Sequence, residues 1–146
     1  MIKAQGLDHI HLAVQNLKQA TGFFSQFMGA KASKVYESAD AGFRFQFVKA
    51  GPIVIQLMEP TTPDSAIAHF IQHWGEGIHA LSFKVAKLES AIKQLESQGL
   101  KLLGKSDSGY IKQAHFTPSG TFSLIVEICE YPGKPGSIME LFEKNA

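Results

Sequence analysis

The chain has 146 residues, 45% of them hydrophobic, and a formal net charge of +1. This length allows one domain, or two tightly fused half-domains, with a sizeable core. Because the net charge is so small, we expect neither a nucleic-acid partner nor binding to a membrane surface. The opening MIKAQGLDH lacks the apolar region of a signal peptide, and no apolar run is long enough to span a membrane. The single Cys129 excludes an intrachain disulfide, so we expect a cytoplasmic protein.

The first half of the chain predicts a β-α-β-β arrangement. Residues 7–14 alternate between apolar and polar positions and predict a strand. Asn16 is a suitable cap for a following helix with apolar residues at helical spacing, and Gly29 is suited to end it. Residues 43–49 and 52–58 predict two strands joined by a tight turn.

The second half repeats this order after a linker. Residues 63–75 predict a capped linker helix with an apolar stripe formed by Ile67, Phe70, Ile71 and Trp74. A strand over 78–85 and a helix that Gly99 ends follow it. Two closing strands, 111–117 and 122–129, are separated by Pro118-Ser119-Gly120. We therefore predict a single domain with four parts: module one at about 5–60, the linker helix at about 63–75, module two at about 77–131, and a surface or subunit-contact tail at 132–146.

Four polar residues interrupt the apolar strand segments, and they form two matched pairs. His9 and Gln56 lie in the first half, and His79 and Glu127 in the second. His79 follows His9 by 70 positions, and Glu127 follows Gln56 by 71. Burying such groups is costly unless a partner satisfies them. Two imidazoles and two side-chain oxygens that face a common centre would form a four-ligand site for a divalent metal.

The alternation of the first strand places two histidines together. Successive side chains of a strand point to opposite faces, so His9 and His11 share one face with Leu7 and Ala13. The opposite face is entirely apolar and is expected to pack on the helices. The histidine face is then the one expected to line a polar concavity.

Three segments carry a recognisable pattern over about residues 7–131: DHIHLAV, IQLMEPTTPDSAIAHFIQHWGEGIHALSFKV and HFTPSGTFSLIVEICEY. In these segments the sequence resembles the vicinal oxygen chelate superfamily, and most closely its methylmalonyl-CoA epimerase branch. The resemblance implies an α+β fold with two tandem βαβββ modules, in which a curved, cup-shaped mixed sheet surrounds one metal site. It also implies a homodimer.

The resemblance places the metal ligands of the family on His9, Gln56, His79 and Glu127, the four residues that the repeat also selects. Two imidazoles and two oxygens suit one divalent metal per chain, such as Co²⁺, Mn²⁺, Ni²⁺, Zn²⁺ or Fe²⁺. In this family the metal chelates two oxygens of the substrate and stabilises the enolate that forms when an α-proton leaves. The family also assigns the role of base to the position of Glu127.

This chain departs from the epimerase pattern in its acid–base groups. A 1,1-proton transfer requires an acid and a base on opposite faces of the substrate carbon. Some family members place a second carboxylate on the strand before the Gln ligand, but residues 43–48 contain none. His11 stands where the family usually has a small residue, and it is the candidate replacement. A hydrogen-bonded pocket histidine is the alternative interpretation of His11.

The sequence thus predicts a metal-dependent epimerase or isomerase that acts on a small molecule, an acyl-CoA or a related carbonyl compound. A glyoxalase I-type lyase that acts on a thiol adduct of glutathione uses the same metal chemistry and remains open. An Fe(II) dioxygenase-like enzyme would use His9, His79 and Glu127 as a facial triad. A small-molecule binding or resistance protein without catalysis is the remaining alternative, in which the four polar residues only line a cavity.

Overall fold

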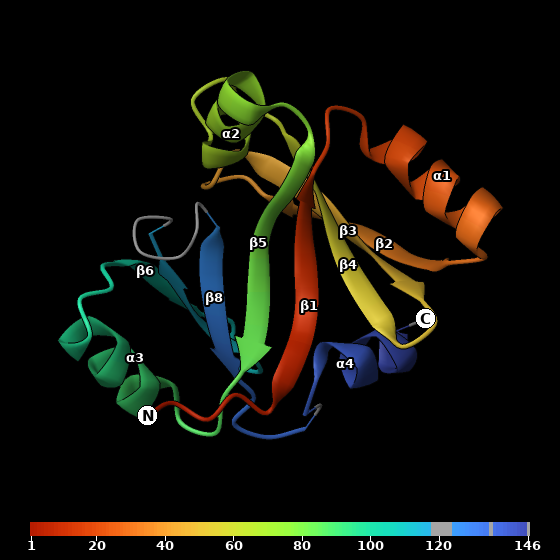
Figure 1. The fold of residues 1–146 in the computed structure, drawn as a ribbon. Coiled ribbons are helices and arrows are strands. Elements are labelled where there is room, and N and C mark those ends of the chain that lie inside the picture. The colour runs from red at the N-terminus through yellow and green to blue at the C-terminus, as the bar shows by residue number, and fades with distance from the viewer. Residues whose placement is uncertain (118–123, 135, 146) are drawn as a thin grey trace. The chain divides into compact units, whose positions relative to one another are not determined.

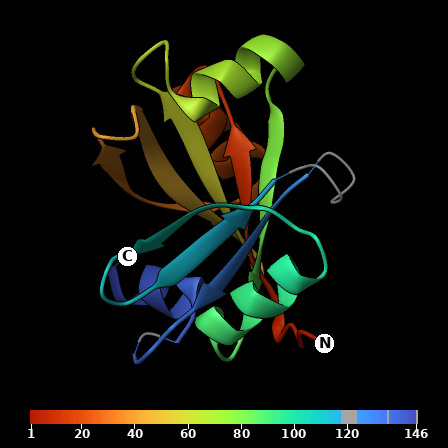
Figure 2. The same cartoon turned by 90° about the vertical axis from the view of Figure 1, so that its left-hand side faces the viewer.

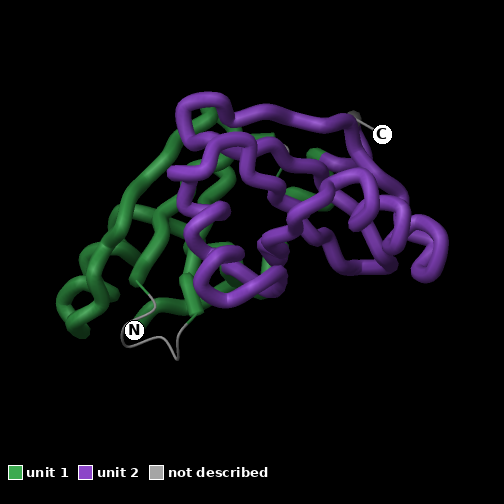
Figure 3. The backbone as a smooth tube through the Cα atoms, turned by 90° about the horizontal axis from the view of Figure 1, so that it is seen from above, with its two compact units in different colours: residues 1–9, 80–141 green, residues 10–79, 142–146 purple. Residues whose placement is uncertain are grey.

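A computed structural model of the chain describes residues 1–117, 124–134 and 136–145. It divides into two compact units, shown in green and purple in Figure 3. Unit 1 is Met1–His9 with Ala80–Leu141, and unit 2 is Ile10–His79 with Phe142–Ala146. The helices and strands, in chain order, are β1 (Gly6–Ala13), α1 (Leu17–Met28), β2 (Lys31–Ser38), β3 (Phe43–Ala50), β4 (Ile53–Pro60), α2 (Ala66–Trp74), β5 (Gly77–Lys84), α3 (Leu88–Ser97), β6 (Leu102–Asp107), β7 (Lys112–Phe116), β8 (Ile125–Glu130) and α4 (Ile138–Asn145).

The strands follow the order β2-β3-β4-β1-β5-β8-β7-β6, and all of them except β7 are labelled in Figure 1. β1 pairs in parallel with β4, and β5 pairs in parallel with β8. Each of these pairs requires a crossover, which contains a helix and two further strands that join by antiparallel pairing. The predicted α+β class with two βαβββ modules is therefore confirmed.

In unit 2, α1 packs on the apolar face of its strands. Val14, Leu17, Val48 and Leu57 form a buried cluster with Ala30. Leu12, Ala20 and Phe24 pack against that cluster, so the apolar face of β1 does meet the helix. The predicted helix ends are also confirmed. Asn16 accepts a hydrogen bond from the amide of Gln19 at 2.9 Å, and Gly29 adopts a left-handed conformation with φ 61°.

In unit 1, α3 packs on its strands in the same way (Figures 1 and 2). The buried cluster there joins Leu88, Ala91 and Ile92 of the helix to Ala114 and Phe116 of β7 and to Ile128 of β8. Gly99, with φ 92°, follows the end of α3 as predicted. In each unit, the helix therefore covers one face of the strands.

Two glutamates near the ends of strands accept hydrogen bonds from the N-terminal amides of the two crossover helices, α1 and α3. Glu59 Oε2 accepts a hydrogen bond from the amide of Leu17 at 2.6 Å, and Glu130 Oε2 accepts one from the amide of Leu88 at 2.6 Å. Both glutamates and both leucines are 71 positions apart, so this contact repeats with the modules. A carboxylate at a helix N-terminus accepts a hydrogen bond from an amide that has no partner within the helix. Its negative charge also interacts favourably with the positive end of the helix dipole.

Replacement of Glu130 by glutamine should lower the free energy of unfolding by about 1 kcal/mol, because the charge at the α3 N-terminus is lost. Lys87 supplies no side-chain cap at that end, so Glu130 is the acceptor the structure shows there. Urea denaturation would measure the change. Glu37→Gln, on the exposed edge strand β2, is the matched control and should change stability by about 0.5 kcal/mol or less. Equal effects of the two changes would contradict a capping role.

The structure adds two strands that apolar alternation does not predict. β2 and β6 are the first and last strands of the sheet order, and most of their side chains are exposed. Edge strands of this kind carry polar residues on both faces, so they lack an apolar period of two. The predicted turn Pro118-Ser119-Gly120 and the start of the predicted strand 122–129 lie outside the described residues.

The linker helix forms α2, and Ser65 caps it through a 3.1 Å bond from the amide of Ala68. The prediction for its apolar stripe was wrong at Trp74, which is 70% exposed. Ile67, near the start of α2, is buried at 1% exposure because it packs against Ala13 of β1 and Met58 of β4. The tail contains α4, whose Ile138 and Phe142 side chains are buried. Among the described residues, no helix combines the length and the apolar character needed to cross a membrane.

Candidate metal and acid–base site

Glu127 is the centre of a polar cluster in unit 1. It lies on β8, and its side chain is fully buried. Its Oε1 accepts hydrogen bonds from Ser82 Oγ at 2.5 Å and from Gln113 Nε2 at 2.8 Å. Its Oε2 lies 2.5 Å from His115 Nε2. The register explains these contacts, since Ser82 on β5 and His115 on β7 both stand opposite Glu127.

His9 is held beside this carboxylate by a second polar group. Its Nδ1 donates a 2.8 Å hydrogen bond to Asp8 Oδ2, and Tyr131 donates a 2.7 Å bond to the same oxygen. Burial favours a higher pKa for Asp8, but the bonds from His9 and Tyr131 outweigh it and keep the pKa below its usual value. Burial, together with the charge of Asp8, raises the pKa of Tyr131, so its phenol stays a donor. The ring of His9 is thus oriented by an ionised carboxylate, as in many metal-ligating histidines.

The two groups meet in an arrangement that favours a cation. His9 Nε2 lies 3.4 Å from Glu127 Oε1, and both side chains are buried, at 1% and 0% exposure. An imidazole whose other ring nitrogen binds a carboxylate, beside a buried carboxylate oxygen, offers two ordinary ligands for a divalent metal. This donor set therefore fits the metal that the sequence predicts.

Unit 2 contains the other three predicted residues, and it places them close together. His11 on β1 stands opposite Gln56 on β4 in the parallel register, so the two side chains share a face. The ring of His11 stacks on that of His79 with centroids 6.5 Å apart. Phe70 of α2 contacts His79 edge-on at 5.0 Å. His11 and Gln56 are buried, at 4% and 8% exposure.

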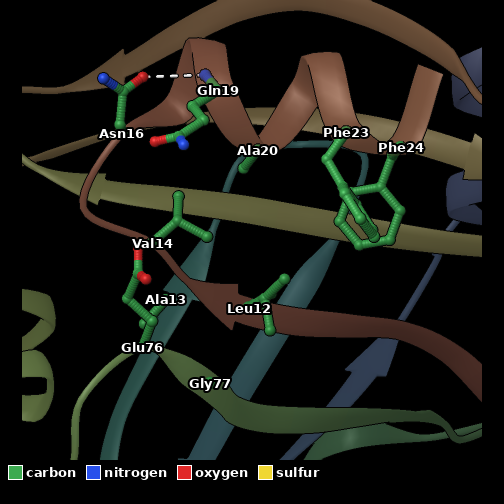
Figure 4. A pocket seen from close by; sticks show the side chains of 10 residues that line it. All are labelled: Leu12, Ala13, Val14, Asn16, Gln19, Ala20, Phe23, Phe24, Glu76 and Gly77. Atoms are coloured by element: carbon green, nitrogen blue, oxygen red, sulfur yellow. Dashed lines mark hydrogen bonds between the residues drawn. The ribbon is translucent and has the colours of Figure 1, made fainter. Parts of the chain in front are cut away.

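A separate hollow of about 340 Å³ lies on the helical side of unit 2 (Figure 4). The end of β1, one side of α1 from Gln19 to Phe24 and the segment Glu76–Gly77 line it. Its lining includes none of the five predicted site residues. Within unit 2, His11 and Gln56 lie on the strand face away from α1, so they do not face this hollow.

Sequence reasoning missed the side chains that orient the two candidate ligands of unit 1. These are Asp8, Ser82, Gln113, His115 and Tyr131. Asp8 had a signal, because it is directly adjacent to His9 in the motif DHIH. Ser82, Gln113 and His115 had none, because their roles depend on strand registers. His115 contacts Glu127 from the neighbouring strand β7.

Residues 8–117 match the Glyoxalase/Bleomycin resistance protein/Dioxygenase superfamily. The chain belongs to this superfamily. The match includes β1, β4 and β5, and with them His9, His11, Gln56 and His79. The predicted family is thus confirmed.

Methylmalonyl-CoA epimerases are among the relatives within the superfamily. The human mitochondrial enzyme is 28% identical over 100 residues, which cover 68% of this chain and 57% of that protein. The crystal structure of the Mycobacterium tuberculosis epimerase superposes with a TM-score of 0.81 and 26% identity, and covers 90% of this chain and 91% of that one. A methylmalonyl-CoA epimerase in complex with methylmalonyl-CoA and NH4+ shares the fold, with a TM-score of 0.82 and 21% identity over 92% of this chain and 99% of that one. These relatives agree with the prediction that the chain is an enzyme of the superfamily.

Proposed function

We propose that this protein is a divalent-metal-dependent isomerase of the epimerase type, which removes and returns an α-proton of a carbonyl substrate. The observation that carries the proposal is the buried pair of Glu127 and His9, with each side chain oriented by hydrogen bonds within unit 1. The methylmalonyl-CoA epimerases among its relatives supply the reaction type. An acyl-CoA is the corresponding small-molecule substrate, because one structural relative is bound to methylmalonyl-CoA.

His9, Gln56, His79 and Glu127 are the proposed metal ligands, and His11 adds a further imidazole from the same strand as His9. His9 and Glu127, both in unit 1, belong to a group of buried side chains whose ligand atoms could hold a metal ion. Two matched pairs of nitrogen and oxygen donors suit Co²⁺, Mn²⁺, Ni²⁺, Zn²⁺ or Fe²⁺. When bound, the metal supplies Lewis-acid stabilisation of the enolate oxygen.

The chain's own residues supply the proton chemistry in this proposal. The Glu127 carboxylate takes the α-proton, and the electron pair of the C–H bond passes into the enolate. Ser82 and Gln113 keep Oε1 oriented, so the carboxylate does not have to reorganise during the transfer. A second group returns a proton to the opposite face of the carbon, and His11 is the proposed donor. Exchange with water then restores both groups.

Two measurements test the proposal. Elemental analysis of protein purified without chelator should find about one divalent metal per chain. Incubation with methylmalonyl-CoA in deuterated water should replace the hydrogen at the α-carbon, as followed by proton NMR. If no metal binds after reconstitution with Co²⁺, Ni²⁺ or Mn²⁺, and no exchange occurs, the protein is instead a small-molecule binder. The homodimer and the cytoplasmic location remain predictions from the sequence.

A further inference from the structure

The hollow on the helical side of unit 2 has the size of a small-molecule site. Its volume of about 340 Å³ lies near the lower end of the roughly 300–1,000 Å³ that ligand pockets in proteins span. Its whole lining belongs to unit 2, so one compact unit forms it completely. None of the residues assigned to the proposed reaction lines it. The chemistry of its lining therefore has to be explained separately.

One end of the hollow is polar and acidic. Asn16, Gln19 and Glu76 gather there, at the beginning of α1 (Figure 4). Glu76 Oε1 accepts a 2.7 Å hydrogen bond from the amide of Gln15, which holds the carboxylate beside the start of the helix. Among the described residues that line the hollow, Glu76 is the one acidic or basic side chain. No basic side chain within the described part of the chain pairs with it, so it can accept a positively charged ligand group.

The beginning of α1 does not favour an anion in this hollow. A helix N-terminus attracts anions through amides that lack an acceptor. Two amides of the first turn already have one: that of Leu17 donates to Glu59 Oε2 at 2.6 Å, and that of Gln19 donates to Asn16 Oδ1 at 2.9 Å. An anion in the hollow would also meet the carboxylate of Glu76. Charge complementarity therefore selects a cation.

The other end of the hollow is apolar and aromatic. Leu12 and Phe24 pack against the buried cluster of unit 2 and line this end. Phe23 lies beside them and is 48% exposed, and its ring meets that of Phe24 edge-on with centroids 5.4 Å apart. Figure 4 shows both rings at the end opposite to Asn16 and Glu76. A half-exposed ring at the edge of a cavity offers a ligand apolar area and a π face that attracts cations.

The spacing of the two ends limits the shape of the ligand. Phe23 follows Gln19 by four residues, which corresponds to about 6 Å along the helix axis. We infer that the hollow binds a small arylalkylammonium ion, with its ammonium group beside Glu76 and its ring against Phe23 and Phe24. Because β1 carries His11 on its opposite face, this inference goes beyond the proposed function and does not rest on it.

Phenethylammonium and hydrocinnamate form a matched pair of probes, because they share a phenyl ring and a short chain and carry opposite charges. NMR titration of the full chain at low ionic strength should show that the cation binds about 10-fold more tightly. The amide signals that shift should be those of the lining, Leu12, Val14 and Gly77 among them. Glu76→Gln keeps an acceptor for the amide of Gln15 and should abolish the preference for the cation.

The aromatic end has its own variant. Phe23→Leu keeps apolar volume but removes the ring, and it should weaken the binding of phenethylammonium by about 2–10-fold. Glu37→Gln on β2 and Phe27→Leu on α1 are the matched controls, because both residues are exposed and neither lines the hollow. Both controls should bind the two probes as the unmodified protein does.

Equal binding of the two probes would overturn the inference. So would a cation preference that persists in Glu76→Gln, or amide shifts that map outside the hollow. A further contrary result would be shifts of the Phe23 and Gly77 amide signals with protein concentration alone, because a second copy of the chain would then cover the hollow. These titrations use no metal and no acyl-CoA, so their outcome is independent of the hydrogen-exchange assay.

Discussion

Glu127→Gln should lower the rate of α-proton exchange by about 10²–10⁴-fold, the range that one positioned acid–base group contributes. The amide cannot accept the proton, although it keeps the size of the carboxylate and a carbonyl oxygen that can accept hydrogen bonds. Its oxygen can still accept from Ser82 and Gln113, which now bind Oε1. Some metal binding should therefore remain. Hydrogen–deuterium exchange of the substrate, followed by NMR, measures the rate.

Glu130→Gln is the control for this experiment, because Glu130 lies on the same strand but its carboxylate binds the amide of Leu88. It should exchange at the rate of the unmodified protein in conditions where both remain folded. Full exchange activity in Glu127→Gln would exclude Glu127 as the base. A similar loss in both variants would indicate a general effect of altered β8 packing.

Loss of a residue that only hydrogen-bonds to a metal ligand weakens metal binding by roughly 10–100-fold. His79→Ala should weaken it by more than this, because the change removes a proposed ligand itself. His79 contacts both His11 and Phe70, so its ring is held in place within unit 2. Elemental analysis after dialysis should find less than about one metal per chain, and activity should fall with the metal content.

His73→Ala is the matched control, since His73 is an exposed histidine in the last turn of α2. It should retain metal and activity. Full metal occupancy in His79→Ala would contradict its assignment as a ligand. The four-ligand site would then have to be reduced to His9, Glu127 and other donors.

Most of the module order was predictable from the residues. Asn16 and Gly29 predicted the ends of α1, and the period-two pattern of residues 7–14 placed His11 on the face away from that helix. β2 and β6 were not predictable from alternation, because edge strands expose both faces. The family resemblance, which implies βαβββ modules, supplied the missing fourth strand of each module instead.

The candidate site was predictable in part. A polar residue within an apolar strand is visible in the sequence, and the repeat of 70 and 71 positions grouped His9, Gln56, His79 and Glu127. Their assignment as ligands stays a prediction. The partners that orient them were hidden, because Ser82 and His115 meet Glu127 through strand registers between residues far apart in the chain. The roles of Glu59 and Glu130 at the helix N-termini were hidden for the same reason.

The sequence by itself determined the family, the two modules and the two faces of the first strand, because these depend on local periodicity and on motifs within short segments. Only the tertiary structure decided which side chains meet. Register and burial placed Asp8 and Tyr131 behind His9 and surrounded Glu127 with donors. Such contacts depend on the pairing of strands that are distant in the chain, and a period of two fixes a residue's face but not its neighbour on the next strand.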